Sequence, residues 1–567
     1  MILRRPFALL AAFSFAAAAT AQGADPEPGH FVPFTPLSQK ELYAKRMRFS
    51  DGEPMISVGI MEGQAEVRVQ ADGPARLMFD EIDLPKTVYT PPETELILRP
   101  QRGKGAELLY WAVVDTKKYA DTDGAQAAKV SWEKKGQAAQ VFEVGTVVSL
   151  QGNVLDTRER HVAVGGFTDR KKAEALINRL SQEEGLRPFL HEELKEVPSG
   201  TIAVYDERGR LLHKAQDSLY FGTVEGGRIF VKQVEHSRGY QSHGRQDRSF
   251  WGHLYVSIDR TGRLTVINAA GAERLLGGLV PAEIFPTAPL EALKAQAVTA
   301  RGEVFSKLGH RHFGEPYHLC SEQHCQVYAG AGFERPETNR AVQETRGLLA
   351  VRPREGKEPL SLVDSVYSST CGGFSEANEV VWDHVASASL RAGLDGMGSD
   401  PALSEFADGL HEGNIRRWLE SYPPTECARS SFVKADKFRW KKTLQQPLLD
   451  KLLSPHRLGK LLSVDVLGRG KGGRVTGLRL IGTLRSVDVL RELPVRRLFG
   501  NLSSGMFVVD QVKNGRGEVT SLTFTGGGWG HGVGMCQVGA IGRAERGQEF
   551  RQILSHYYGG AVVERIY

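Results

Sequence analysis

Cysteine is scarce in this sequence, with five residues among 567. All five lie in the C-terminal half, so disulfides cannot be the main scaffold of the protein. In an oxidising compartment, an odd count leaves at least one thiol unpaired or bound to something else. The five residues are Cys320, Cys325, Cys371, Cys427 and Cys536.

The chain also has little excess charge of either sign. Its formal net charge is +5, and removing Arg4 and Arg5, which stand in a segment without acidic residues, leaves +3. A charge this small on a chain of this size argues against nucleic acid as a partner.

Long apolar runs are missing after the first residues, which excludes a later membrane-spanning helix. The run from Pro6 to Ala18 is shorter than the ~20 residues that a bilayer core requires. It follows two arginines and ends at Ala19-Thr20-Ala21, a small-x-small cleavage pattern. We therefore expect residues 1–21 to be a signal peptide, with a transmembrane anchor as the alternative. No cysteine stands directly after the run, which argues against a lipoprotein.

The remaining composition predicts a folded protein. Hydrophobic residues make up 41% and charged residues 25% of the chain, which is enough for two or three domains. In residues 22–155 the run MISVGIMEGQAEVRVQADG alternates apolar residues around a glycine turn, as strands do. We predict an α+β, strand-rich multidomain protein with a few helices, whose catalytic domain lies on the C-terminal side.

Residues 156–225 begin with a β-α-β pattern. A short strand at His161 to Val164 precedes a Gly-Gly break and a helix with Ala173, Leu176, Ile177 and Leu180 on one face; a second strand is expected after Gly185. The VxVGxF opening resembles the first half of a SPOR domain, which implies binding to glycan strands stripped of their peptides. A generic β-α-β packing unit is the alternative.

Residues 226–567 contain the most informative segment. A helix is expected to begin beside Pro289, whose missing N–H suits a first turn, and to run to about Lys307. Arg301 falls at the edge of its apolar face, either in an internal salt bridge or carbonyl clamp, or orienting an acidic or sugar group. Glu283 is expected in an irregular turn before this helix. Apolar neighbours raise the pKa of such a carboxyl and a helix terminus lowers it, so a structural acid is an open alternative.

Four blocks in this region resemble the signatures of the stage II sporulation protein D family, also called amidase enhancers. They are PAEIFPTAPLEALKAQAVTAR, CSEQHCQVYAG, VYSSTCGG and GGGWGHGVGMCQVGAIGRA, in that order. FRW, at Phe438 to Trp440, also fits the family. Together these motifs spread over roughly residues 230 to 567.

The resemblance implies a lytic transglycosylase that acts on peptide-free glycan, with Glu283 at the position of the family's acid. Most glycosidases use two carboxyl groups. A lytic transglycosylase needs one, because the muramyl 6-hydroxyl is the internal nucleophile. Glu283 would protonate the glycosidic oxygen and then take the proton of that hydroxyl, leaving a 1,6-anhydro end. No cofactor is required.

The other blocks supply the predicted substrate contacts. Glycine density lets the last block pass close to another surface, and in the family it faces the cleft. A glycine turn packed under the core, with a structural histidine, is the alternative. In the Ser-rich turn we expect Ser369 to reach the ligand, although a serine that only caps the turn is an equal alternative. A Cys371 nucleophile lacks any supporting motif. The predicted contacts are Arg301, Gln326, Tyr328, Ser369, Trp529, His531 and Gln537.

The HLCSEQHCQVY block concentrates thiols and imidazoles. His318, Cys320, His324 and Cys325 fall within eight positions, and His312 lies just upstream. A Cys320–Cys325 disulfide is the preferred interpretation. The alternative is zinc held by Cys320, Cys325 and His312, since some family members are similar in carrying a metal near the cleft.

A second function from a different class fits the same blocks. The protein would be a non-catalytic glycan-binding partner that activates a cell-wall amidase. Either way, we expect peptidoglycan glycan strands as the ligand and a periplasmic or cell-wall location. A zinc hydrolase is a third hypothesis, which rests on the thiol and imidazole cluster alone.

Overall fold

The structure is a computed structural model that describes residues 36–50, 52–81, 84–238, 243–353, 360–382, 385–396 and 400–567. The predicted signal peptide, residues 1–21, lies outside the described residues. Leu37–Tyr567 form one compact unit. Strand makes up 40% of the structure and helix 26%, which confirms the predicted strand-rich α+β class.

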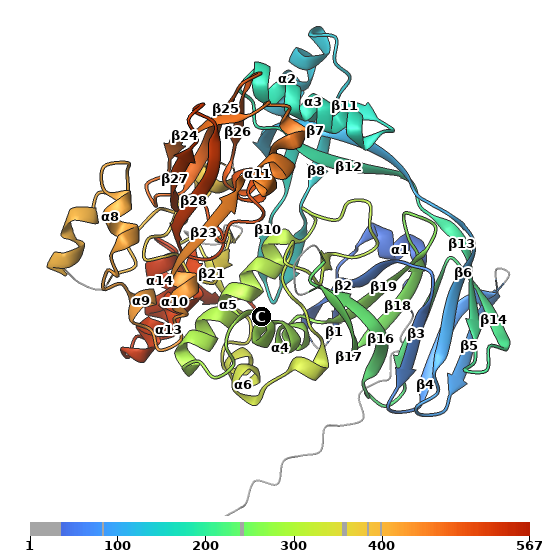
Figure 1. Ribbon diagram of the computed structural model, residues 1–567. Coiled ribbons are helices and arrows are strands. Elements are labelled where there is room, and N and C mark those ends of the chain that lie inside the picture. Colours follow the sequence, from blue (N-terminus) through green and yellow to red (C-terminus); the bar gives the residue numbers. More distant parts are fainter. Residues whose placement is uncertain are drawn as a thin grey trace, which may run out of the picture. The chain divides into compact units, whose positions relative to one another are not determined.

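The largest sheet joins strands from distant parts of the sequence (Figure 1). In spatial order its strands are β1 (Arg48–Ser50), β2 (Glu53–Gln64), β19 (Leu264–Gly271), β18 (His253–Ile258), β15 (Ser218–Thr223), β4 (Ala75–Glu81) and β5 (Leu84–Thr90), and β20 (Leu319–Cys320) pairs with β2. Two neighbouring strands near one edge of this sheet, β2 and β19, are antiparallel, with Leu264 opposite Gln64 and Gly271 opposite Met55.

A second, six-stranded sheet shares a hydrophobic core with the first. That core also includes residues of the helices described below, so the sheets and helices pack as one body. The strand order is β14 (Leu211–Gln216), β13 (Ser199–Tyr205), β6 (Leu96–Lys104), β3 (Val67–Ala71), β16 (Ile229–His236) and β17 (Gly244–Phe250). Strands from both sides of the predicted boundaries at residues 155 and 225 therefore pair with one another.

The β-α-β pattern forms part of a separate four-stranded antiparallel sheet. The predicted strand, helix and strand are confirmed as β11 (Glu159–Phe167), α3 (Arg170–Glu183) and β12 (Phe189–Glu196), and α3 buries Ala173, Leu176 and Leu180. The other half comes from earlier in the chain, as β7 (Glu107–Lys118), α2 (Thr122–Lys134) and β8 (Ala139–Val144), in the spatial order β12-β7-β11-β8.

Two helices lead to the candidate site. The predicted helix after Pro289 is confirmed as α5 (Leu290–Lys307), but it is buried on almost all sides rather than on one face. It is enclosed because Leu293 and Ala297 belong to one hydrophobic cluster and Ala295 and Val298 to another.

The segment before α5 is helical, and here the expected irregular turn was wrong. Residues Ala272–Glu283 form α4, which contains Pro281 in its last turn. Proline removes a backbone donor there, but the helix continues to Glu283 before the chain becomes extended at Ile284.

The C-terminal half adds two three-stranded sheets. One has the order β23 (Arg439–Gln445), β28 (Val519–Gly527) and β27 (Phe507–Lys513), and the other β24 (Leu461–Arg469), β25 (Val475–Gly482) and β26 (Ser486–Leu490). Within the described ranges, none of the helices has both the length and the apolar character needed to cross a lipid bilayer.

Candidate active site

Glu283 is held at both its carboxyl and its backbone. It is half-buried at the last residue of α4. The backbone N–H of Val327 donates to its Oε1 at 2.6 Å, and Gln537 Nε2 donates to its carbonyl oxygen at 2.9 Å. The first and last sequence blocks therefore meet at this residue, as the predicted site requires.

The surroundings of Glu283 favour its protonated form. Burial raises the pKa of this carboxyl to about 7, outweighing the opposite effects of the Val327 N–H, the Lys307 charge and the Tyr367 hydroxyl. A carboxyl with a pKa near neutrality can both donate and accept a proton at that pH.

Tyr367 is a site residue that the sequence analysis missed. Its hydroxyl donates to Gln326 Oε1 at 2.8 Å, and the same hydroxyl is one of the groups that lower the pKa of Glu283. Gln326 is itself fixed, since its Nε2 donates to the carbonyl of Ala300 at 3.1 Å. One signal in the sequence could have indicated Tyr367, because it lies in the same VYSSTCGG block as the predicted contact Ser369.

His531 is held in place within the glycine-rich loop. Its Nδ1 accepts from the Val533 N–H at 3.1 Å, and Trp382 packs on its ring with ring centroids 4.7 Å apart. Burial lowers its pKa to about 3. The imidazole is therefore neutral at physiological pH and positions its neighbours.

Glycine is required in this loop because the backbone passes close to other groups. Gly528, Gly530, Gly532 and Gly534 all have positive φ. A Cβ on Gly534 would lie 2.1 Å from the carbonyl oxygen of Val366. The loop can thus follow β22 (Tyr367–Ser368), with which β29 (Met535–Cys536) pairs in parallel.

Gln537 has a positioning role. It is buried at the start of α13 (Gln537–Glu545), and its Nε2 also contacts Gln296 Oε1 at 3.2 Å. Its amide thus links α13 to the end of α4 and to α5.

Arg301 lies within the core, and its side chain is 0% exposed. Its Nε and Nη2 donate to the two carboxylate oxygens of Glu273 at 2.8 and 2.7 Å, and Nη1 donates to the Leu348 carbonyl at 3.1 Å. Arg301 therefore forms the internal salt bridge and carbonyl clamp that were expected as the alternative. The expected role of Arg301 in orienting a ligand is corrected, because its donors bond to protein groups.

The remaining predicted contacts have different surroundings. Tyr328 is buried, and its hydroxyl donates to Asn268 Oδ1 at 2.8 Å. The carbonyl of Ser369 accepts from the Val538 N–H. Trp529 is 43% exposed, and the Lys437 ammonium lies 4.8 Å from its ring centroid. Of these three, Trp529 is the residue that is exposed to solvent.

A second group with a raised pKa lies near Lys307. Desolvation of the carboxyl by the surrounding protein and the charge of Glu303 raise the pKa of Asp364 to about 7, although the residue as a whole is exposed. Lys307 is paired with Glu303 and also donates to the Cys325 carbonyl at 2.8 Å. Lys307 therefore links the two regions, because its charge lowers the pKa of Glu283 and its ammonium bonds to the cysteine-containing loop.

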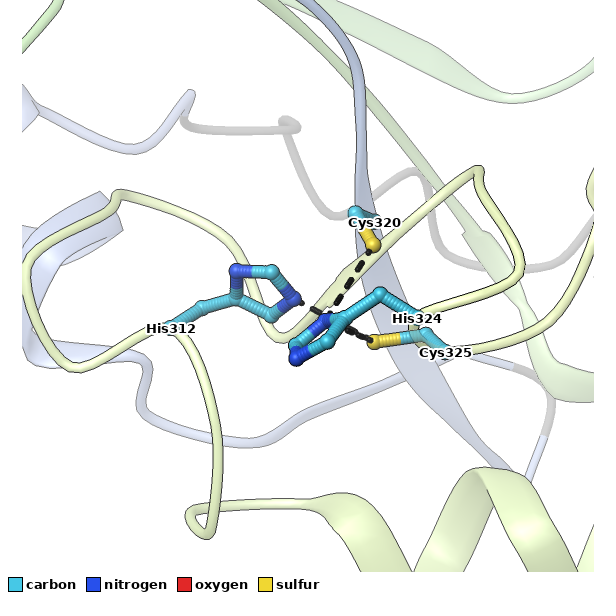
Figure 2. Close-up of side chains that lie close together, drawn as sticks. All are labelled: His312, Cys320, His324 and Cys325. Carbon is cyan, nitrogen blue, oxygen red and sulfur yellow. Dashed lines mark hydrogen bonds between the residues drawn. The ribbon is translucent and has the colours of Figure 1, made fainter. Parts of the chain in front are cut away.

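That loop brings His312, Cys320, His324 and Cys325 together, with potential ligand atoms within 4.8 Å of one another (Figure 2). The preferred disulfide is absent, because both of these described cysteines are free. Each sulfur atom instead contacts Nδ1 of His324 at 3.7 Å, and His312 Nε2 lies 3.2 Å from Cys325 Sγ.

These donors fit zinc. Zn–S and Zn–N bonds of about 2.3 and 2.0 Å in a tetrahedron place sulfur and nitrogen about 3.5 Å apart, close to the observed contacts. His318 is not part of this set. Its Nδ1 is 2.6 Å from Ser57 Oγ, and its Nε2 is 3.2 Å from the Lys45 carbonyl.

The fold and site thus define an α+β protein whose distant segments converge on one partly buried carboxyl. Residues 260–351 match the family described as stage II sporulation protein, and residues 376–534 match a domain of unknown function (DUF8618). These findings and the relatives below confirm the predicted relation to the stage II sporulation protein D and amidase-enhancer family. The SPOR-like module stays a prediction.

Three relatives are similar to this chain, and two of them carry the family's names. An uncharacterized protein of Brachyspira hyodysenteriae is 27% identical over 314 residues, 55% of this chain and 72% of the relative. The amidase enhancer of Bacillus subtilis is 27% identical over 311 residues, 51% of this chain and 40% of its own. Stage II sporulation protein D of Bacillus amyloliquefaciens is 30% identical over 161 residues, which are 28% of this chain and 42% of the relative. The chain therefore spans less than half the length of the two Bacillus proteins.

Proposed function

We propose that this protein acts in the bacterial cell wall as a lytic transglycosylase that cleaves peptide-free glycan strands, with Glu283 as acid and base. The main support is the Glu283 carboxyl, which accepts a hydrogen bond from the Val327 N–H and has its pKa raised to about 7 by burial. A role in the cell wall agrees with the family, as does export to the periplasm or wall.

The reaction needs one carboxyl because the substrate brings its own nucleophile. Protonated Glu283 gives its proton to the glycosidic oxygen as the bond from that oxygen to the muramyl C1 breaks. The 6-hydroxyl of the same sugar attacks C1 and loses its proton to the Glu283 carboxylate, which restores the acid and closes the 1,6-anhydro ring. Holding the hydroxyl close contributes through its high effective concentration.

The chain's other groups position the acid. The Val327 N–H limits the movement of the carboxyl, and Gln537 fixes the backbone that carries it. His312, Cys320, His324 and Cys325 would hold a zinc ion, which supplies structural cross-linking of their loop when bound.

The test is digestion of purified peptide-free and peptide-bearing glycan, with products identified by mass spectrometry. We expect anhydro-muramyl ends from peptide-free strands, and none with Glu283→Gln. Asp364→Asn is the matched control, because it removes another carboxyl with a pKa near 7. Full activity of a folded Glu283→Gln protein would refute the assignment.

The second candidate is a glycan-binding activator of an amidase, which is favoured by the name of the Bacillus subtilis relative. Intact strands, tight glycan binding and faster cleavage by an added cell-wall amidase would support it.

A further inference from the structure

A second thiol cluster lies in the core of the C-terminal half. Cys371, Asp395, Cys427 and Cys536 place their potential ligand atoms within 4.8 Å of one another. Each residue is at most 1% exposed. The proposed glycan chemistry uses none of them. They are also too deeply buried to be an ordinary group of solvated surface charges.

The spacing of the cluster suits a metal ion better than a disulfide. Cys371 Sγ lies 3.7 Å from both Cys427 Sγ and Asp395 Oδ2. In a tetrahedral zinc site with Zn–S bonds of about 2.3 Å and Zn–O bonds of about 2.1 Å, the ligand atoms are about 3.6–3.8 Å apart. A disulfide would require about 2.05 Å between sulfur atoms.

Hydrogen bonds to Oδ1 of Asp395 fix its carboxylate, so that Oδ2 is oriented as a ligand atom. Tyr557 donates to Oδ1 at 2.8 Å, and the Arg543 guanidinium lies 3.3 Å from the same atom. Oδ2 faces Cys371 and accepts from the Cys427 N–H at 3.2 Å. Outer hydrogen bonds that fix a ligating side chain in this way are typical of metal sites.

The contacts of Cys536 favour its thiolate form. Cys536 Sγ accepts from the backbone N–H groups of Cys371 at 3.2 Å and Gly539 at 3.3 Å. It caps the N-terminus of α13, where negative charge is stabilised. Three thiolates and a carboxylate exceed the charge of Zn²⁺, and two buried guanidinium groups offset the excess: Arg543 beside Asp395, and Arg474, whose Nη2 donates to the Cys371 carbonyl at 3.1 Å.

We propose that Cys371, Cys427, Cys536 and Asp395 bind one structural zinc ion. Four protein ligands close the coordination shell, so the ion has no open position for a reacting water. It cross-links the turn after β22, the Asp395 segment, α9 (Glu426–Arg429) and the end of β29. Since Gln537 follows Cys536 directly, this cross-link anchors the residue that holds the Glu283 carbonyl.

The first test measures zinc in the full chain after the cluster of Figure 2 has been removed by His312→Ala and Cys325→Ser. We expect about one zinc ion per chain to remain, as a closed four-ligand site predicts, and to be lost on adding Cys427→Ser. Cys320→Ser in the same background is the matched control and should retain the ion. No zinc in the folded background protein would overturn the proposal.

The second test needs no substitution, which matters because core cysteine variants can fail to fold. Crystals of the full chain grown with zinc should give an anomalous peak at the zinc edge between these four side chains. A Cys371–Cys427 disulfide, or free thiols without a peak, would overturn the proposal. Both tests are independent of glycan cleavage, so they can fail or succeed separately from the proposed function.

Discussion

The backbone N–H of Val327 donates a 2.6 Å hydrogen bond to Glu283 Oε1, and Val327 stands two residues after Cys325. The loop that carries the thiol and imidazole groups therefore also holds the candidate acid. Lys307 strengthens the connection, because it bonds to the Cys325 carbonyl and its charge lowers the Glu283 pKa. Any disturbance of the cysteine loop should consequently reach Glu283.

Glycan cleavage should lose activity at alkaline pH. Glu283 must start protonated, and burial raises its pKa to about 7. We expect kcat/KM to be level just below neutrality and to fall about tenfold per pH unit above it. Initial rates of anhydro-end formation across this range measure the effect. Asp364→Asn should keep the same alkaline limb, and a limb that moves with this variant would assign the titration to Asp364.

Glu283→Gln should stabilise the fold at alkaline pH. The folded-state pKa is raised from 4.5 to about 7, so the folded protein binds this proton more tightly than the unfolded chain. That contribution is complete below pH 4.5 and is lost as pH rises through 7. The glutamine variant should therefore match the parent in acid and exceed it by up to about 3 kcal/mol above neutrality. Urea unfolding at both pH values measures this difference, and an equal gain in acid would contradict the ionisation argument.

Tyr367→Phe should move the alkaline limb to higher pH, because the lost hydroxyl helps to lower the Glu283 pKa. The variant also leaves Gln326 Oε1 without the hydroxyl donor, which should cost about 1–3 kcal/mol of unfolding free energy. A pH–rate profile and urea unfolding measure the two effects. A loss of stability with an unmoved limb would restrict Tyr367 to a structural role.

Removing the cluster of Figure 2 should lower zinc content and heat stability together. Cys325→Ser should release about one zinc ion and reduce Tm, since structural zinc contributes directly to folding. Elemental analysis and calorimetry test this, with exposed His243→Ala as the control. A zinc content unchanged by Cys325→Ser would rule the cluster out.

Arg301→Met should destabilise the protein by about 3–5 kcal/mol, because it leaves Glu273 buried without its cation. Adding Glu273→Gln should recover part of the loss. The alkaline limb of a folded variant should not move, as Arg301 is not among the groups that shift the Glu283 pKa. A moved limb would return Arg301 to the site.

Local patterns predicted individual elements well. Pro289 and the apolar spacing after it located α5, and the VxVGxF run located β11. The spacing could not reveal that α5 is enclosed on all sides, because that depends on two cores built from distant segments. For the same reason Arg301 looked like a boundary residue, although its partner Glu273 lies 28 positions away.

The site was predicted unevenly. Glu283 and Gln537 were named from separate blocks, and the structure brings them together. Tyr367 was missed because its block does not show its tertiary surroundings: its hydroxyl donates to Gln326 and helps to lower the pKa of Glu283. The thiols of Cys371, Cys427 and Cys536 are far apart in sequence, so only tertiary contacts reveal their cluster.

The antiparallel pairing of β2 with β19 has a consequence for how the protein is made. During synthesis β2 cannot form this pairing until β19, roughly 200 residues later in the chain, has been made. Closing so long a loop late favours slow folding and leaves unpaired strand edges exposed to aggregation in the interim. Shortened chains that begin after residue 225 would keep such edges permanently, so fragments of the C-terminal half should be poor substitutes for the full protein in biochemical work.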